Sequence, residues 1–470
     1  MHFRLLLNTV LYKKSTFLFL CTMLCLVTIV VFVLNLHQAA NDQYTYINYV
    51  KGLQQGRYTC WYFLKEYIPD TFRNPGYPFF LYTISFISES IFTIKIVQLL
   101  LLFISLVLMF KIIDQYEHGW VVKNLFMLLT MFNVIILAYP TLIFPEILML
   151  FLITLIVYLE LCYNPNAWWH VLLMVVLYGY CFQVRPIILF IPFIRCGYYL
   201  WKRSKLPLLK NMSFIVLFLA TLLPYGMWNL KQHGQFKITP LEGGGGAMHA
   251  GYWSPKMVGY SANRYWINTM NRDVFVNFAT DDESKHNVQL YNNEWDSIDA
   301  LCHQYLTPSD SSFLLKMNEH KELFPTYNAR FTIEREKILN KLAVRHYMND
   351  LYYTIKLKCY TFFRLWYTGL SLNQYTLMNR FELTRTIIAF IATSTTLLLF
   401  IGYFFICLIK RRKILAIIWL PLFFCLYFDI FHLPFVIQSR YTIPVRFLYL
   451  FSLSFMIYQI HFNKTEKHES

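Results

Sequence analysis

An acid, an arginine and a group of aromatic residues lie together in the segment 42–78, between two apolar stretches. Asp42 follows the apolar run 17–36 by a few residues, so we expect its carboxylate just outside the hydrocarbon of a membrane, ionised and facing lipid headgroups. The turn RNPGYP at 73–78 would hold Arg73 at the same height, where a guanidinium can bind a phosphate through two parallel hydrogen bonds. The segment therefore predicts an active-site loop.

The residues that follow Asp42 have a helical pattern. Tyr46, Tyr49 and Val50 recur at helical spacing, which predicts a short amphipathic helix along the membrane interface with Lys51 at its far end. Tyr46 is the aromatic residue that we expect beside a substrate. The alternative is a connector whose aromatic residues only form an interfacial belt, and both interpretations fit the segment.

Four further residues that could bind a substrate stand at the ends of other apolar segments. Glu146 ends the motif PTLIFPE, Arg185 lies in VRP, and Arg440 and Tyr441 lie in SRYTIP. The predicted topology places all of them on the same outer face as the segment 42–78. Charged residues at such positions are costly without a partner or a function, so each could instead pair with a neighbouring helix.

The composition decides the class of protein that must position these residues. Of the 470 residues, 57% are hydrophobic and only 14% are charged, which is more apolar surface than a soluble fold of this length could bury. We therefore expect an all-α polytopic membrane protein. The net charge of +16 lies in short loops beside apolar runs, where it orients the chain and binds anionic lipid rather than nucleic acid. The ten cysteines form no C-x-x-C pair, which argues against a zinc ribbon and gives no disulfide framework.

The apolar runs predict about ten or eleven membrane-spanning helices, with both ends of the chain in the cytoplasm. Basic residues beside the runs set the orientation, and KRRK at 410–413 is the strongest of these signals. The stretch 77–87 is too short to span alone, so its status stays open. The predicted spans and this short piece are 17–36, 77–87, 91–113, 124–139, 146–161, 168–183, 187–201, 212–229, 386–409, 415–431 and 444–458.

This pattern divides the chain into three parts. Residues 1–229 form an N-terminal membrane domain with a first outer, catalytic loop at 37–90. Residues 230–385 are more polar and form an extracytoplasmic insert of mixed structure. Residues 386–470 form C-terminal membrane helices and a cytoplasmic tail.

Three features stand out in the insert. Apolar residues from Phe331 to Ala343 recur with a helical period and predict a soluble amphipathic helix. The four glycines at 243–246 predict either a mobile loop whose amides approach an anion or a plain flexible connector. The stretch 352–370 is predicted as an amphipathic helix on the outer surface.

These motifs together resemble a known family of membrane enzymes. D-x-x-x-Y at 42–46, R-x-P-G-Y-P at 73–78, P-x-x-x-x-P-E, V-R-P and R-Y-x-x-P occur here in the order typical of the GT-C glycosyltransferases. That superfamily includes the protein O-mannosyltransferases and the lipid A aminoarabinose transferase, and its members use polyprenyl-phosphate sugars. PYGMWN at 224–229 is similar to the P-W-x-x-R-N pattern of the bacterial members, with Tyr225 and Trp228 in place of Trp and Arg.

The resemblance implies a function and a division of roles. The chain would be an inverting glycosyltransferase that moves a sugar from a polyprenyl-phosphate donor to a lipid, glycan or protein. Asp42 would be the general base or would orient the acceptor, Arg73 would bind the lipid phosphate, and Arg440 or Arg185 would form a second clamp. Burial could raise the pKa of Asp42 and help it accept a proton.

Other interpretations stay open at this point. An O-antigen polymerase or ligase also handles lipid-linked glycans with arginines, and a lipid-linked glycan transporter would place polar groups at the membrane midplane. Glu66, Asp70 and His249 could hold a divalent metal, although their spacing matches no recognised site, and no cofactor is otherwise implied. We expect a multi-pass protein of the cell membrane, with a bacterial inner membrane favoured over an endoplasmic reticulum.

Overall fold

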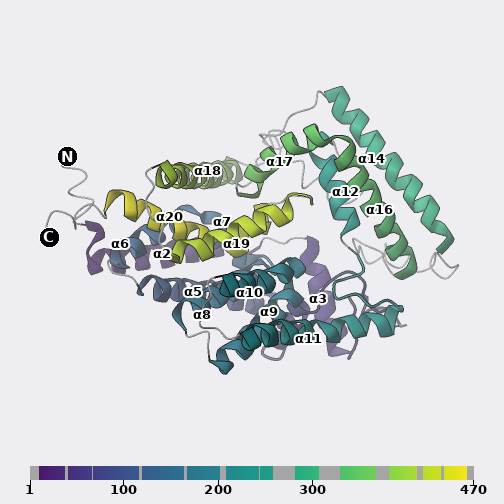
Figure 1. Ribbon diagram of the computed structural model, residues 1–470, viewed down its shortest axis with the longest axis horizontal. Coiled ribbons are helices and arrows are strands. Elements are labelled where there is room, and N and C mark those ends of the chain that lie inside the picture. Colours follow the sequence, from purple (N-terminus) through teal and green to yellow (C-terminus); the bar gives the residue numbers. More distant parts are fainter. Residues whose placement is uncertain are drawn as a thin grey trace.

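The computed structural model describes residues 10–37, 41–65, 67–115, 119–163, 167–201, 208–242, 244–257, 281–305, 329–366, 380–409, 416–435 and 439–462. Within these residues the chain folds into α-helices and short 3-10 helices, without a strand. The all-α class predicted from the composition is therefore confirmed. In Figure 1 a bundle of helices occupies one end of the molecule, and α12 (Gly245–Trp253), α14 (Asp281–Cys302) and α16 (Ala329–Asn349) stand at the other end.

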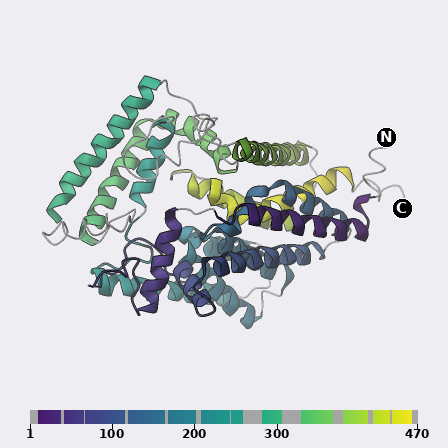
Figure 2. The ribbon, with the colours of Figure 1, turned by 180° about the vertical axis from the view of Figure 1, so that it is seen from behind.

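The bundle combines the N-terminal and C-terminal parts of the chain. The start of α2 (Lys14–Leu34) and the end of α20 (Arg446–His461) lie at the end of the bundle far from α12, as both Figure 1 and Figure 2 show. The rings of Tyr12 and Phe462 are in contact there, with centroids 6.2 Å apart. Besides α2 and α20, the elements of this part are α3 (Asn41–Gln54), α4 (Gly76–Ser85), α5 (Ile91–Ile113), α6 (Gly119–Phe132), α7 (Val134–Ala138), η1 (Tyr139–Thr141), α8 (Glu146–Cys162), α9 (Trp168–Val184), η2 (Pro186–Phe190), α10 (Ile191–Trp201), α11 (Leu208–His233), α17 (Leu351–Trp366), α18 (Arg380–Ile409), α19 (Ala416–His432) and η6 (Ser439–Val445).

Five helices in the described part of the chain are long and apolar enough to cross a membrane. They are 14–34, 91–113, 208–233, 391–409 and 440–461, and a bent pair at 119–141 makes a sixth if it counts as one span. Shorter apolar helices cover 168–184, 186–200 and 418–432. The structure thus supports a membrane protein of five to six spans, and the count of ten or eleven stays a prediction.

The number of buried residues differs between α2, on the outside of the bundle, and α20, at its centre. Helix α2 is apolar all round but buries only Leu20, Leu24, Thr28 and Phe32, which are spaced four residues apart on one face. Its other apolar side chains need an apolar surrounding, which a bilayer provides. Helix α20, by contrast, is buried on nearly all sides and forms the centre of the bundle.

The segment predicted as a span at 124–139 is not one continuous helix: the chain bends by 70° between α6 and α7, and the segment is a membrane span only if this bent pair counts as one. The bend falls at Asn133, which lies between the two helices and is buried. The Oδ1 atom of Asn133 accepts a hydrogen bond from Nη1 of the buried Arg446, at 3.1 Å. This hydrogen bond to a buried cation stabilises the break between the two helices. The sequence at the break contains no proline that would have predicted it.

The described part of the insert is helical, so the mixed structure predicted for it is not found there. Helices α12, α14 and α16 enclose a small core of their own that includes Trp253, Tyr291 and Leu339. Two 3-10 turns, η3 (Ser254–Met257) and η4 (His303–Tyr305), follow α12 and α14. The amphipathic helix predicted around 331–343 is confirmed as α16.

Helix α17 (Leu351–Trp366) occupies most of the predicted surface helix at 352–370, and residues 367–370 lie outside the described ranges. Its last turn contacts the bundle. The indole of Trp366 donates a hydrogen bond to Asp429, and its carbonyl accepts one from Arg446.

The last two glycines of the run 243–246 form the start of a helix rather than a mobile loop. Gly245 and Gly246 belong to α12, and their backbone amides both donate to Oε2 of Glu336, at 2.6 and 3.2 Å. The anion expected near these amides is therefore a carboxylate of the chain itself, bound at a helix N-terminus. Gly243 lies outside the described residues.

Gly245→Ala is expected to destabilise the insert, because a Cβ atom at this position would overlap the backbone carbonyl of Glu336. Overpacking against backbone atoms that cannot rotate away costs about 2–3 kcal/mol. Gly244→Ala is the matched control, since nothing lies within 4 Å of its Cβ position. The measurement is the melting temperature of the purified protein. Equal melting temperatures for the two variants would contradict this packing.

Candidate active site

Asp42 lies in the first turn of α3 (Asn41–Gln54), between two arginines that are distant in the sequence. Its Oδ2 atom is 3.5 Å from Nη2 of Arg73 and 3.4 Å from Nη1 of Arg440. The helix N-terminus adds a favourable partial positive charge. The structure therefore brings together three residues that the sequence places at 42, 73 and 440.

Glu146 and Arg185 form the second half of the same cluster. Glu146 begins α8, Arg185 follows α9, and the two side chains make an ion pair. The Nε atom of Arg440 lies 3.9 Å from Oε1 of Glu146, so Arg440 connects this pair to Asp42. One continuous network results, containing three guanidinium groups and two carboxylates.

Solvent reaches one side of this network. The side chains of Asp42, Arg73, Arg185 and Arg440 are each 21–27% exposed, whereas Glu146 is 0% exposed. Glu146 is thus the buried counterion, and the other four groups form a partly open surface. A ligand can contact them without unfolding the site.

Both tyrosines named from the sequence line the network. The guanidinium carbon of Arg73 lies 5.4 Å from the ring centroid of Tyr46, and that of Arg185 lies 5.4 Å from the ring centroid of Tyr441. Rings at this distance attract a cation and limit the positions it can take. All seven residues selected from the sequence therefore lie in one place.

The turn that carries Arg73 is attached to the end of α9. The Asn74 amide donates to the carbonyl of Phe182, and the Tyr180 hydroxyl donates to the carbonyl of Gly76, both at 3.2 Å. A Cβ atom at Gly76 would overlap the backbone at Gln183, so only glycine allows this approach. The contact fixes the Arg73 turn beside the end of α9, which Arg185 follows directly.

Two tyrosines that the sequence analysis did not select as site residues hold the backbone of Arg73. The hydroxyls of Tyr58 and Tyr225 both donate to its carbonyl oxygen, at 2.8 and 3.0 Å. Tyr225 also stacks on Trp228, with ring centroids 5.7 Å apart. The partial family pattern at 224–229 was the available signal for Tyr225, whereas nothing in the sequence marked Tyr58.

Asp70 supports the Arg73 turn and does not join the group proposed as metal ligands. It is fully buried, and its carboxylate accepts hydrogen bonds from the Tyr49 hydroxyl and from the amides of Phe72 and Arg73, the latter two at 2.9 and 3.0 Å. Burial raises the pKa of Asp70 to about 6, although these hydrogen bonds act in the opposite direction. Its oxygens are therefore occupied in holding the turn.

The other two residues of that ligand group do not complete it. His249 lies in the insert and contacts Glu294 rather than Asp70. Glu66 lies outside the described residues. The predicted combination of Glu66, Asp70 and His249 is thus not assembled by the residues that the structure describes, because Asp70 and His249 have different partners.

The expected rise in the pKa of Asp42 is wrong. Burial does act to raise this pKa, but the positive charges of Arg73 and Arg440 outweigh burial, and the pKa of Asp42 lies below its usual value. The opposite charges also hold the pKa of Arg73 above its ordinary range despite burial. Asp42 is therefore ionised at neutral pH and is a weak base while both arginines contact it.

No protein-family model, curated protein or solved structure matches this chain.

Proposed function

We propose that this protein is an inverting membrane glycosyltransferase that moves a sugar from a polyprenyl-phosphate donor to a lipid, glycan or protein acceptor. Catalysis takes place at the extracytoplasmic face of the cell membrane, with a bacterial inner membrane as the favoured location. The observation that carries the proposal is the position of Asp42, within 3.5 Å of both Arg73 and Arg440. A carboxylate between two partly exposed guanidinium groups provides a base beside a phosphate site.

The charge of the network fits the donor. Arg73, Arg185 and Arg440 carry three positive charges, and Asp42 and Glu146 carry two negative ones, which leaves one positive charge in excess. A polyprenyl-phosphate sugar is a phosphodiester with one negative charge, so its binding would neutralise the site. A diphosphate-linked glycan, the donor of a polymerase or ligase, would bring a second negative charge that the network does not balance.

The reaction follows from this placement. The acceptor hydroxyl attacks the anomeric carbon from the face opposite the phosphate, and the bond between that carbon and the phosphate oxygen breaks. The electron pair of this bond moves to the phosphate, where Arg73 and Arg440 stabilise the added charge. Asp42 accepts the proton of the hydroxyl or holds the hydroxyl in line for the attack.

Binding of the donor also changes the basicity of Asp42. In the free protein Arg73 and Arg440 lower its pKa. When the phosphate takes hydrogen bonds from these guanidinium groups, their positive charge is partly neutralised, while the burial that acts to raise the pKa remains. The carboxylate becomes a stronger base only when the donor is in place, which limits loss of the sugar to water.

Arg73→Ala is expected to weaken the binding of polyprenyl phosphate about 10- to 100-fold, because a charge-assisted hydrogen bond contributes about 1.5–3 kcal/mol. The measurement is a titration of the purified protein in nanodiscs with polyprenyl phosphate, and with polyprenol, which lacks the phosphate. A transfer assay with a panel of sugar-labelled polyprenyl-phosphate donors then tests catalysis.

Arg57→Ala is the matched control for Arg73→Ala. Arg57 lies in the same segment, where its guanidinium donates to the carbonyl of Lys65 at 3.4 Å and contacts none of the network. This variant should bind polyprenyl phosphate like the wild type. Equal binding by the wild type and Arg73→Ala would refute the phosphate site, and transfer only from diphosphate-linked glycans would favour a polymerase or ligase.

A further inference from the structure

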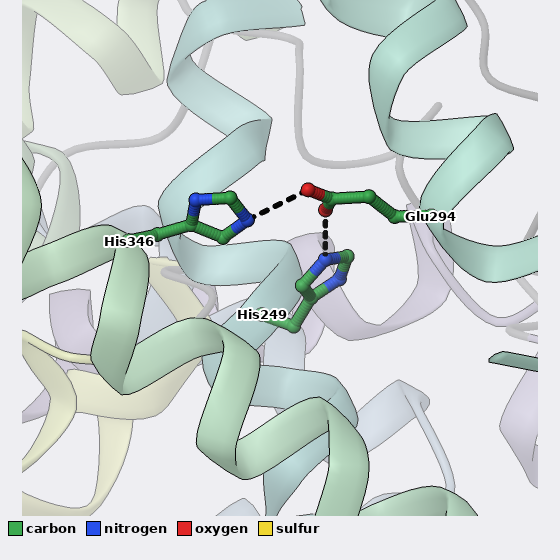
Figure 3. A group of neighbouring side chains, drawn as sticks. All are labelled: His249, Glu294 and His346. Carbon is green, nitrogen blue, oxygen red and sulfur yellow. Dashed lines mark hydrogen bonds and ion pairs between the residues drawn. The ribbon is translucent and has the colours of Figure 1, made fainter. Parts of the chain in front are cut away.

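The insert contains a second group of functional side chains, separate from the network around Asp42. His249 of α12, Glu294 of α14 and His346 of α16 converge from three helices, as Figure 3 shows. The Nε2 atom of His249 is 2.7 Å from Oε2 of Glu294, and Nε2 of His346 is 2.8 Å from Oε1. The three potential ligand atoms all lie within 4.8 Å of one another.

Aromatic side chains surround this group and restrict its movement. The ring of Tyr291 stacks on His249 with centroids 5.4 Å apart, and the ring of Tyr252 stacks on His346 at 4.7 Å. The indole of Trp253 donates a hydrogen bond to Oε2 of Glu294, at 2.8 Å. Partners of this kind orient ligand side chains in metal sites and exclude water from them.

The burial of the group also fits a bound cation. His249 is 0% exposed, and the side chains of Glu294 and His346 are 23% and 21% exposed. The group is therefore closed by protein on the side of His249 and reached by solvent at Glu294 and His346. A site with three protein ligands and one open position has this form.

The donor set and its dimensions fit zinc. Two imidazole nitrogens and one carboxylate oxygen are ligands that zinc accepts, with bonds of about 2.0–2.2 Å. Neighbouring ligand atoms in a tetrahedral site are then about 3.3 Å apart. The two His–Glu separations of 2.7 and 2.8 Å would widen by about half an ångström. All three ligand atoms already lie within 4.8 Å of one another, so side-chain rotations can bring them to this spacing.

We propose that His249, Glu294 and His346 bind one zinc ion that joins α12, α14 and α16, with a water molecule in the fourth position. The core that these helices share is small, and the chain segments between them are long, at 258–280 and 306–328. A metal that connects three helices compensates for a small core. The site is independent of the proposed glycosyl transfer.

The test is zinc binding by the full-length protein, purified in detergent without a polyhistidine tag and treated with a chelator. After incubation with zinc and removal of the free ion, elemental analysis should find about one zinc per chain. Glu294→Gln and His346→Ala should lower this content to background. His286→Ala is the matched control, because His286 is an exposed residue of α14 outside the group, and it should keep the zinc.

A second measurement separates a metal site from a metal-free triad. Zinc should raise the melting temperature of the wild type and of His286→Ala, but not that of His346→Ala, because only a protein that binds the ion in its folded state is stabilised. Where a variant fails to fold, cobalt loading of the wild type shows whether the protein binds a metal, since tetrahedral cobalt with histidine ligands gives strong visible absorption. A wild type that binds neither zinc nor cobalt, or variants that keep the zinc, would overturn the proposal.

Discussion

Asp42→Asn should lower the rate of sugar transfer about 10²- to 10⁴-fold while the protein still binds polyprenyl phosphate. The substitution preserves the size of the side chain and removes the carboxylate that would accept the acceptor proton, and general-base catalysis contributes a factor of this size. Donor binding should stay the same or become tighter, because Arg73 and Arg440 lose a competing negative charge 3.5 and 3.4 Å away.

The assay for Asp42→Asn measures the maximal rate and the donor concentration at half-maximal rate separately. Asp282→Asn is the matched control, since the side chain of Asp282 is 96% exposed and belongs to the insert, and this variant should transfer normally. If Asp42→Asn keeps its maximal rate within about threefold, Asp42 is neither the base nor the group that orients the acceptor.

The pH dependence of the wild type follows from the direction of the pKa shift. The pKa of Asp42 is lower in the folded protein than its ordinary value, so its ion pairs stabilise the fold above about pH 4 and are lost only as the pH falls further. Asp42 is therefore ionised throughout the range from about pH 5 to 8. This range applies to the donor-free protein. At donor concentrations well below saturation, where the rate reports the free protein, any fall in the wild-type rate on acidification from pH 8 to 5 must come from another group.

Glu146→Gln is expected to lower the stability of the protein by about 3 kcal/mol. Glu146 is fully buried and pairs with Arg185, and Arg440 lies 3.9 Å from the same oxygen. Removing one partner of a buried ion pair leaves an uncompensated charge, which typically costs about 3–5 kcal/mol, and the low end applies because Arg185 is partly exposed. Thermal unfolding of the purified variant in detergent measures the loss.

A double variant separates loss of the pair from loss of packing. Glu146→Gln with Arg185→Gln removes both charges and should recover more than half of the stability lost in Glu146→Gln. Glu89→Gln is the surface control, because Glu89 is exposed and bonds only to Gln54 among the described residues, and it should change stability by less than about 0.5 kcal/mol. A single variant as stable as the wild type would show that Glu146 is not the counterion of the network.

Transfer activity should fall in Glu146→Gln as well, and the double variant should not restore it. Without Glu146 the positions of Arg185 and Arg440 are no longer fixed, and a displacement of about 1 Å at a catalytic group can cost about 10²-fold in rate. Stability and activity would thus respond differently in the double variant. Recovery of both together would mean that Arg185 has only a structural role.

The sequence determined most of the apolar helices and allowed the residues of the candidate active site to be selected. Apolar runs of sufficient length gave most helix positions to within a few residues, because a helix in a membrane must satisfy its own backbone and expose apolar side chains. The prediction for 91–113 coincides with α5. Charged residues at the ends of such runs are rare without a reason, which is why Asp42, Arg73 and Arg440 could be selected before their contacts were known.

The tertiary structure decided which of these charges pair and what their pairing does. Arg440 lies 398 positions after Asp42 in the sequence, and only the tertiary fold, which packs η6 against α8 and α19, brings the two side chains into contact. The same contact reverses the expected shift in the pKa of Asp42, because the charge of a distant segment outweighs local burial. The direction of this pKa shift therefore cannot be predicted from the residues near Asp42 in the sequence.

Contacts with distant parts of the chain also explain the other differences between the sequence predictions and the structure. The bend at Asn133 depends on Arg446, the helical start at Gly245 depends on Glu336, and the position of His249 depends on α14 and α16. Each partner is more than 40 residues away in the sequence. Local patterns fix what a segment can form, whereas the free energy of burying a polar group depends on the partner that the fold supplies.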